Sequence, residues 1–229
     1  MCGRFGLAAT PEDIAGLLEV EATEIDIEGP RFNITPSSKC LVVRHDRRRA
    51  KRVQGVTWGL IPSWASDPKV GQRLTNARSE TVREKPAFRE AFRRRRCLVL
   101  TDGFYEWRRH KGEKQPFHIG MPNNEVFCFG ALWERWRDSH GVNHDTFAIL
   151  TTTPNELMAP IHHRMPVIIE PSDFERWLDR DVPEQALIPL LRPCAADTLI
   201  CWPVSTRVNN ARHDDEGCRA PATPPARLL

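Results

Sequence analysis

The fold is decided most clearly by the stretch CLVLTDGFYEW, which spans residues 97–107. Its four apolar residues at 97–100 predict a buried strand, and the Asp102-Gly103 pair predicts the turn behind it. Six further segments are rich in β-branched or aromatic residues and are bounded by turn formers, as strands are. They are residues 40–44, 53–58, 117–119, 126–131, 146–150 and 167–169. Strands therefore dominate the chain.

Three helices are expected among these strands. Residues 10–13, Thr-Pro-Glu-Asp, combine a hydroxyl cap, a first-turn proline and two acids, and the helix they start is expected to end near Glu21. Residues 86–95 and 172–178 predict two more. Strand and helix do not alternate regularly, which argues against a doubly wound sheet. We expect an α+β fold: a single domain on a mainly antiparallel, barrel-like β-sheet core with a few peripheral helices.

The length of 229 residues suits one domain, which we place at residues 2–211. From Arg212 the chain is rich in proline, alanine and charge, so residues 212–229 are predicted to form a disordered C-terminal tail. No run approaches the ~20 apolar residues of a membrane helix. The start, Met-Cys-Gly-Arg-Phe, lacks the pattern of a secretory signal, and a cytoplasmic protein is expected.

The composition argues against metal and nucleotide cofactors. The seven cysteines are odd in number and show no C-x-x-C spacing, so neither a disulfide framework nor a zinc site is expected. The glycine-rich motifs G-x-G-x-x-G and G-x-x-x-x-G-K are absent. Two basic clusters, at residues 44–52 and 93–96, are either solvated faces or a phosphate-binding surface.

Cys2 has chemistry that no internal cysteine has. Because Cys2 is small, we expect Met1 to be removed, which leaves an α-amine and a thiol on adjacent carbons. Their reference pKa values, about 7.7–8.0 and about 8.5, keep a useful fraction of each group nucleophilic near pH 7. Such a pair attacks an aldehyde to give an imine, which sulfur closes to a thiazolidine. The alternative is an incidental residue on a frayed terminus.

Four polar segments lie where strands give way to loops, as side chains of a site on a rigid scaffold do. They are residues 76–81, 102–107, 150–155 and 161–166. They supply the carboxylate of Glu106, the amide of Asn76 and the imidazole of His162 or of its neighbour His163, groups suited to acid–base work on an imine. Each also has a structural explanation: a surface ion pair, a turn residue or a loop histidine.

Six motifs in order resemble the SOS-response-associated peptidase (SRAP) family, over about residues 2–209. They are MCGRF at the start, RFNITP at 31–36, WGLIPSW at 58–64, NARSET at 76–81, GFYEW at 103–107 and IHHRMP at 161–166. The sequence departs from the family's pattern at Phe32, Thr35, Leu100 and Ala65. The last of these replaces a second tryptophan of some relatives and predicts a weaker base-stacking wedge.

The resemblance implies a function in DNA repair. The family senses abasic sites in single-stranded DNA and cross-links to them through the N-terminal cysteine. By this resemblance Cys2 is the nucleophile, Asn76 positions it, Glu106 is the acid–base group and His162, not His163, moves a proton.

The resemblance also implies which residues touch DNA. Those matching the grip on the DNA backbone are Arg4, Arg78, Thr151 and Arg164. Pro36 and Trp64 match the wedge that separates or stacks on bases. The expected partner is single-stranded DNA with abasic sites, bound by a monomer without metal or cofactor, at the nucleoid during DNA damage. Contact with the replication machinery is left open.

Two other functions compete with this one. In a cysteine peptidase, Cys2 with Glu106 and His162 would cleave the Met1–Cys2 bond of the chain itself. In a passive single-strand binding module, Cys2 would be incidental and undamaged DNA would bind equally well. Lyase activity is expected as a side reaction of the cross-linking site, because a lingering imine promotes elimination of the 3′ phosphate.

Overall fold

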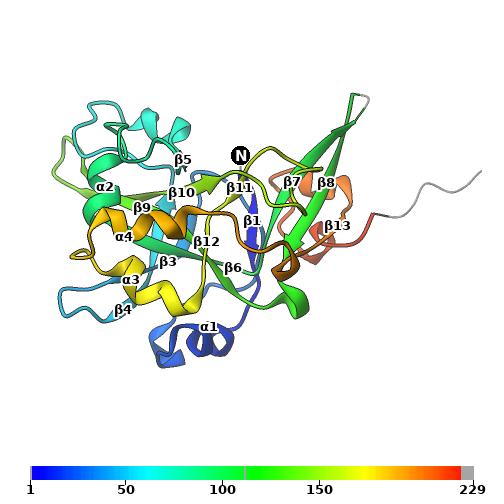
Figure 1. Ribbon diagram of the computed structural model, residues 1–229, viewed down its shortest axis with the longest axis horizontal. Coiled ribbons are helices and arrows are strands. Elements are labelled where there is room, and N and C mark those ends of the chain that lie inside the picture. Colours follow the sequence, from blue (N-terminus) through cyan, green and yellow to red (C-terminus); the bar gives the residue numbers. More distant parts are fainter. Residues whose placement is uncertain (1, 111, 223–229) are drawn as a thin grey trace, which may run out of the picture.

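A computed structural model describes residues 2–110 and 112–222. Two β-sheets form the barrel-like core, and short helices lie around it (Figure 1). The first sheet has the strand order β13-β8-β7-β1-β2. Its strands are Ile200–Pro203 (β13), Glu113–Gly120 (β8), Gly103–His110 (β7), Phe5–Leu7 (β1) and Arg31–Ile34 (β2).

The second sheet has the order β11-β10-β4-β3-β6-β9-β12, with β5 beside β10. Its strands are Met165–Pro166 (β11), Asn143–Thr152 (β10), Lys51–Trp58 (β4), Lys39–His45 (β3), Arg96–Thr101 (β6), Phe127–Arg137 (β9), Ile168–Ile169 (β12) and Asn76–Arg78 (β5). Every pairing is antiparallel except those of β10 with β4 and β5. The α+β class and the mainly antiparallel core that the sequence predicted are confirmed.

The helices are short and peripheral: Pro11–Leu18 (α1), Arg89–Arg94 (α2), Phe174–Leu178 (α3) and Glu184–Leu187 (α4). The predicted start of α1 is confirmed in detail. Thr10 and Asp13 form a reciprocal capping box, in which each side chain accepts from the other residue's main-chain N–H. None of the helices in the described ranges is long and apolar enough to cross a membrane.

Strand β1 belongs to the first sheet and packs against the second, which fixes the position of the N-terminus. The ring of Phe5 lies 5.1 Å from that of Trp58 and 5.9 Å from that of Phe129, both in the second sheet. The register pairs Phe5 with Phe104, and the Tyr105 N–H donates to the Arg4 carbonyl at 2.9 Å. Because the strands are antiparallel, the chain before Arg4 runs on beside Glu106.

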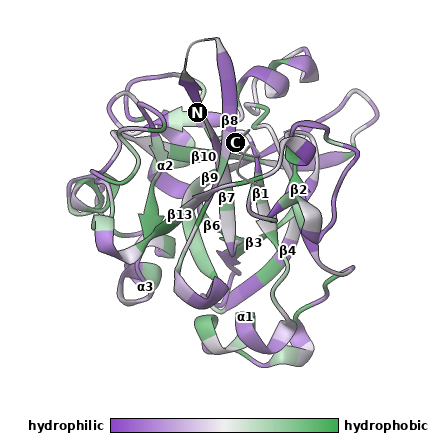
Figure 2. Cartoon of the chain, turned by 90° about the vertical axis from the view of Figure 1, so that its right-hand side faces the viewer, coloured by the Kyte–Doolittle hydropathy of each residue, from purple (hydrophilic) through white to green (hydrophobic). Residues whose placement is uncertain are grey.

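The β7–β8 hairpin extends beyond the core. Figure 1 shows it projecting from the body of the molecule, and Figure 2 shows that its outer part is hydrophilic. The sequence predicted only residues 117–119 of this hairpin as a strand, because charged residues occupy most of its outer half. Arg109 pairs with Lys114 there.

The prediction of a disordered tail is wrong for residues 212–222, which are ordered in the structure. Asp214 accepts the main-chain N–H groups of Phe32 and Asn33 at 2.5 and 2.7 Å and pairs with Arg31. Arg219 forms an ion pair with the buried Asp102. Specific partners therefore order a segment whose composition is typical of disorder. The remainder of the predicted tail, residues 223–229, lies outside the described residues.

Candidate active site

Cys2 lies in the interior, beside the start of β5. Its side chain is fully buried, and its carbonyl accepts the Nδ2–H of Asn76 at 2.9 Å. Burial raises the pKa of the Cys2 thiol far above its usual value, and the negative charge of Glu106 raises it further. At neutral pH the sulfur is therefore a thiol and not a thiolate.

Asn76 is positioned by two neighbours on the second sheet. It starts β5, where it pairs with Ile149 of β10, and its Nδ2 also contacts the Thr75 hydroxyl at 3.2 Å. Its Oδ1 is buried and accepts no hydrogen bond from residues 2–110 or 112–222. The amide therefore holds the Cys2 main chain with one end and offers an acceptor with the other.

The side chains of Glu106 and His162 come together from two distant segments. Glu106, on β7, is only 3% exposed, and its Oε1 lies 3.9 Å from Nδ1 of His162. Burial raises the pKa of Glu106 and lowers the pKa of His162. Nδ1 of His162 lies 3.1 Å from both the main-chain nitrogen and the carbonyl oxygen of Arg164, and these contacts hold the ring in place.

The structure distinguishes the two adjacent histidines, which the residues' spacing could not. His163 is exposed, and its ring lies 4.3 Å from that of His162. His162 is the one whose ring nitrogen lies within ion-pair distance of Glu106.

A pocket of about 490 Å³ opens beside these groups. Glu106 and His162 line it together with Trp107, Arg109, Lys114 and Asn209. The Trp107 indole N–H donates to Asn209 Oδ1 at 2.7 Å, which fixes the ring in the wall. The sequence interpretation missed Arg109, Lys114 and Asn209. The only signal for Arg109 and Lys114 was the basic run in the β7–β8 hairpin, which resembled an ordinary solvated turn, and Asn209 lies in a separate segment far along the chain.

The residues predicted to touch DNA divide into two groups. Trp64 and Arg78 are exposed, Trp64 to 67%, and Pro36 is partly exposed. Arg4, Thr151 and Arg164 instead have internal contacts. Arg4 donates to Asn33 Oδ1 and to the Val208 carbonyl, at 2.7 and 2.6 Å.

Arg164 and Thr151 connect the strand ends that carry the site. Arg164 pairs through both Nη atoms with Glu80 and donates to the Thr151 carbonyl at 2.6 Å. Thr151 in turn pairs with Arg78 across β10 and β5. These contacts hold the segment of His162 against the segment of Asn76, so both residues support the framework of the site.

A model of the SOS response associated peptidase (SRAP) family matches residues 1–211. The chain belongs to this family. It is 37% identical to the abasic site processing protein YoqW of Bacillus subtilis (strain 168), over 93% of this chain and 96% of that protein. It is 30% identical to the abasic site processing protein HMCES of Xenopus tropicalis, over 96% of this chain and 78% of that protein.

The fold matches solved structures as well. A crystal structure of a protein from Bacteroides thetaiotaomicron superposes with a TM-score of 0.85 at 24% identity, covering 97% of this chain and all of that one. A phage-related protein from Bordetella bronchiseptica gives 0.71 at 27% identity, over 89% of this chain and 94% of that one. In this SRAP chain, no group of His, Cys, Asp or Glu within the described ranges could hold a metal ion.

Proposed function

We propose that this SRAP protein recognises abasic sites in single-stranded DNA and links to them covalently through Cys2 after loss of Met1. The observation that supports the proposal is that buried Cys2, held by Asn76, lies within the electrostatic influence of Glu106, which lines a pocket together with its neighbour His162. The names of its relatives, abasic site processing proteins, support the same substrate.

The amine reacts first in this proposal, because burial keeps the thiol protonated. The Cys2 nitrogen attacks C1′ of the open-chain sugar, and neutral His162 moves the amine proton to the new alkoxide. Its lowered pKa keeps the imidazole neutral and able to accept that proton at pH 7. The free oxygen of Asn76 is suited to hold the amine or a sugar hydroxyl.

Glu106 then completes both remaining steps. Its raised pKa favours the protonated acid, which donates to the carbinolamine hydroxyl as water leaves and an iminium forms. The Cys2 sulfur adds to the iminium carbon, and the thiol proton returns to the Glu106 carboxylate. One water is lost overall, and the thiazolidine nitrogen keeps its single hydrogen.

DNA contacts are proposed around the mouth of this pocket. Arg109 and Lys114 line it and carry charges suited to backbone phosphates. Exposed Trp64 and Arg78 offer a stacking surface and a further cation. A single strand is favoured because the base-free sugar must turn into the pocket. Lyase cleavage is proposed as a side reaction, when the iminium loses a proton at C2′ before sulfur adds.

The test is a denaturing gel with a single-stranded oligonucleotide that carries one abasic site. The protein, with Met1 shown to be absent by mass, is expected to give a shifted band that survives denaturation. Cys2→Ser keeps the amine but cannot form the thiazolidine, so its band is expected only after borohydride reduction. A stable band from Cys2→Ser without reductant would contradict the role of sulfur.

Peptidase activity is a second candidate because the matching family description names it. A cysteine peptidase requires a thiolate, and burial disfavours a thiolate at Cys2. The test compares Met1 in chains produced in the same cells, in which Cys2 and Cys2→Ser lose this residue. Retention of Met1 in Cys2→Ala would favour self-cleavage only if a chain with a different small residue at position 2 also retained Met1.

A further inference from the structure

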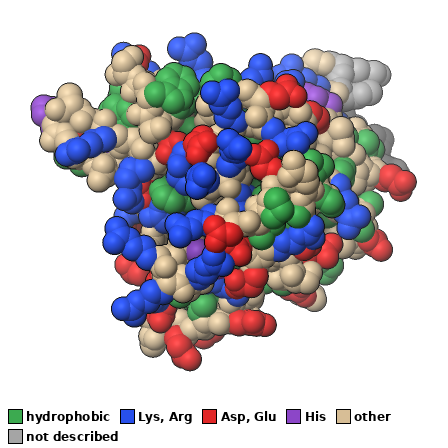
Figure 3. All heavy atoms as spheres, turned by 60° about the vertical axis from the view of Figure 1, so that its left-hand side comes forward, with side chains coloured by type: hydrophobic (Ala, Val, Ile, Leu, Met, Phe, Trp, Pro, Cys, Tyr) green, Lys and Arg blue, Asp and Glu red, His purple; other side chains and the backbone are tan. Residues whose placement is uncertain are grey.

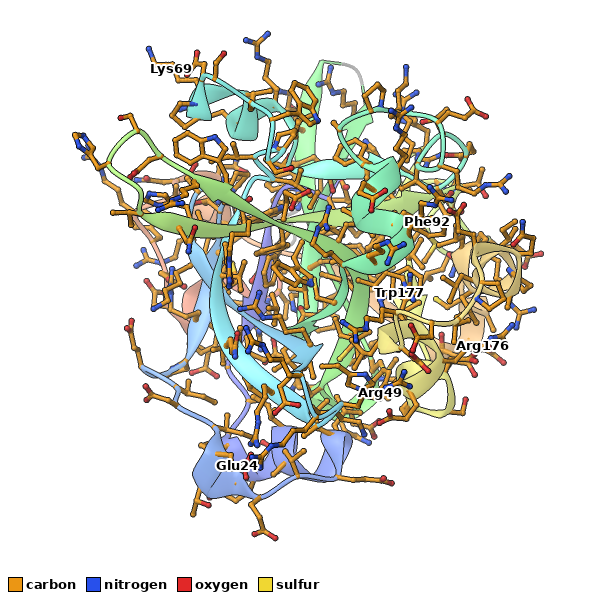
Figure 4. The ribbon with its side chains drawn as sticks, turned by 90° about the vertical axis from the view of Figure 1, so that its left-hand side faces the viewer. Glu24, Arg49, Lys69, Phe92, Arg176 and Trp177 are labelled. Carbon is orange, nitrogen blue, oxygen red and sulfur yellow. The ribbon has the colours of Figure 1, made fainter. Side chains whose placement is uncertain are left out.

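A second pocket lies among the β3–β4 turn, α2 and α3, on the side of the molecule away from the β7–β8 hairpin (Figure 1). Its volume is about 120 Å³. Figure 4 views this side and labels Arg49 of the turn, Phe92 of α2 and Trp177 of α3. The two basic clusters of the sequence, around residues 44–52 and 93–96, both contribute residues to this pocket, although residues 53–92 separate them in the chain. The function proposed above uses neither cluster.

Arg96 supplies a buried positive charge to this pocket. It is 3% exposed, and its donors bind four carbonyl oxygens at the ends of α2 and α3: those of Phe92, Arg93, Trp177 and Asp179. Burial lowers the pKa of Arg96 to about 10, so the guanidinium remains charged at pH 7. No carboxylate within the described part of the chain forms an ion pair with it. Its hydrogen-bond partners are therefore all carbonyl dipoles, and the carboxylates of Asp179 and Glu184 act on the charge only from beyond ion-pair distance.

Arg44 contributes a guanidinium that is fixed in place. It stacks over the Trp133 ring at 4.3 Å, and its Nε and Nη2 bind Gln54 and Asp145. Its Nη1 is buried and, among residues 2–110 and 112–222, has no hydrogen-bond partner. Arg44 therefore places a rigid guanidinium in the wall of the pocket.

The exposed rim adds cations whose charges are not paired. Arg47 and Arg180 line the pocket and form no ion pair with any described residue. The two acids of the lining are already engaged. Asp46 accepts from the Arg48 and Ala50 N–H groups, and Asp179 binds Arg49. Figure 3 shows Lys and Arg side chains gathered on this side of the molecule, with acidic ones between them.

We propose that this pocket binds a phosphate group. The free guanidinium groups of Arg47 and Arg180 match the oxygens of a tetrahedral dianion, and the charges of Arg44 and Arg96 in the pocket wall attract it. The volume suits one compact group. The phosphate belongs either to a DNA backbone that extends past the lesion pocket or to a free phosphate compound. The chemistry of Cys2 plays no part in this binding.

The test uses inorganic phosphate and isothermal titration calorimetry. The double variant Arg47→Ala/Arg180→Ala removes the two exposed cations and leaves the buried ones, so the fold is retained. We expect its Kd for phosphate to rise at least tenfold. Arg48→Ala is the matched control, because Arg48 is exposed on the same turn but does not line the pocket. Its Kd is expected to change less than twofold.

A second arm identifies the source of the phosphate. Affinity for an undamaged single-stranded 30-mer is measured against salt, where each phosphate that is no longer neutralised lowers the slope by about 0.7. A lower slope in the double variant, together with weaker phosphate binding, assigns the site to the DNA backbone. Weaker phosphate binding with an unchanged slope assigns it to a free phosphate compound. The proposal is overturned if wild type shows no saturable phosphate binding, or if the double variant binds as Arg48→Ala does.

Discussion

Burial of the Glu106 carboxylate carries an electrostatic cost. This carboxylate is almost fully buried, and its raised pKa means that the folded chain binds a proton more tightly than the unfolded chain. Between the unfolded and the folded pKa the native state therefore holds more protons, and stability falls as pH rises through that window. Above the folded pKa the full penalty remains.

Glu106→Gln is therefore expected to stabilise the protein while it slows the chemistry. At pH 8 its Tm should exceed that of wild type by about 2–4 °C for each kcal/mol of penalty removed, and at pH 4 the difference should vanish. Cross-linking should slow about 10²–10⁴-fold, because an amide cannot act as a general acid or base. Calorimetric scans at the two pH values and a gel time course measure both effects. An equal Tm difference at both pH values would contradict the buried-carboxylate explanation.

Asn76→Ala tests positioning at the same scale. Loss of the hydrogen bond to the Cys2 carbonyl should slow cross-linking about 10²-fold, since small misplacements of reacting groups cost that much. Affinity for undamaged single-stranded DNA should remain within twofold. Asn143→Ala, an exposed asparagine on β10, is the control and should leave both values unchanged. Equal slowing of both variants would remove the special role of Asn76.

For single residues, the sequence predicted which residue types form the candidate site better than it predicted the tertiary contacts that surround them. The motifs indicated Cys2, Glu106 and His162 as candidates, and the contact of His162 with Glu106 supports the choice of His162 over His163 that the family resemblance implied and that spacing alone left open. Arg4 and Arg164 have internal partners contributed by segments far away in the chain, such as Val208 and Glu80. Local sequence does not reveal such partners, so the two arginines resembled free DNA contacts.

Among the elements, the C-terminal segment differs most from its sequence prediction. Residues 212–222 have the composition of a tail, yet Asp214 satisfies two main-chain N–H groups of β2 that no strand covers there. Strands such as β9 and β10 were predicted at their apolar centres but are longer than expected, because pairing with a neighbour extends them into polar residues. Composition alone does not predict either effect.

Asp214→Ala is expected to destabilise the protein by about 1–3 kcal/mol, because it leaves partly buried donors without an acceptor. Denaturant unfolding measures the change in the free energy of unfolding. Glu216→Ala, two residues away and exposed, is the control and should stay within about 0.5 kcal/mol of wild type. If Asp214→Ala leaves the free energy of unfolding unchanged, the segment contributes nothing to the stability of the fold.

The β7–β8 hairpin has its own prediction as an element. Arg109→Ala/Lys114→Ala should weaken binding to single-stranded DNA without sequence preference and lower the salt slope by about 0.7 for each phosphate that these side chains neutralise. Anisotropy titrations at several salt concentrations measure it. Arg137→Ala, an exposed arginine at the end of β9, should leave the slope unchanged. If both proteins give the wild-type slope, the hairpin does not contact the backbone.

In the whole molecule, the candidate active site and the second pocket lie in separate regions. The two sheets bring Cys2 against β5 and bring β7 against the loop before β11, and no one of these elements could form the candidate site alone. The sequence predicted the class of the fold because strand patterns are local. It could not predict the second pocket, because that pocket depends on where α2 and the β3–β4 turn meet.

The central claim is that the aldehyde of an abasic site becomes bonded to Cys2, and the intact mass of the product tests it most directly. After incubation without reductant, we expect one species with the mass of protein plus oligonucleotide less one water, and digestion should place the adduct on the N-terminal peptide. Unmodified protein of the correct mass, with Met1 absent and the lesion intact, would contradict the claim. An adduct on any other residue would contradict it equally.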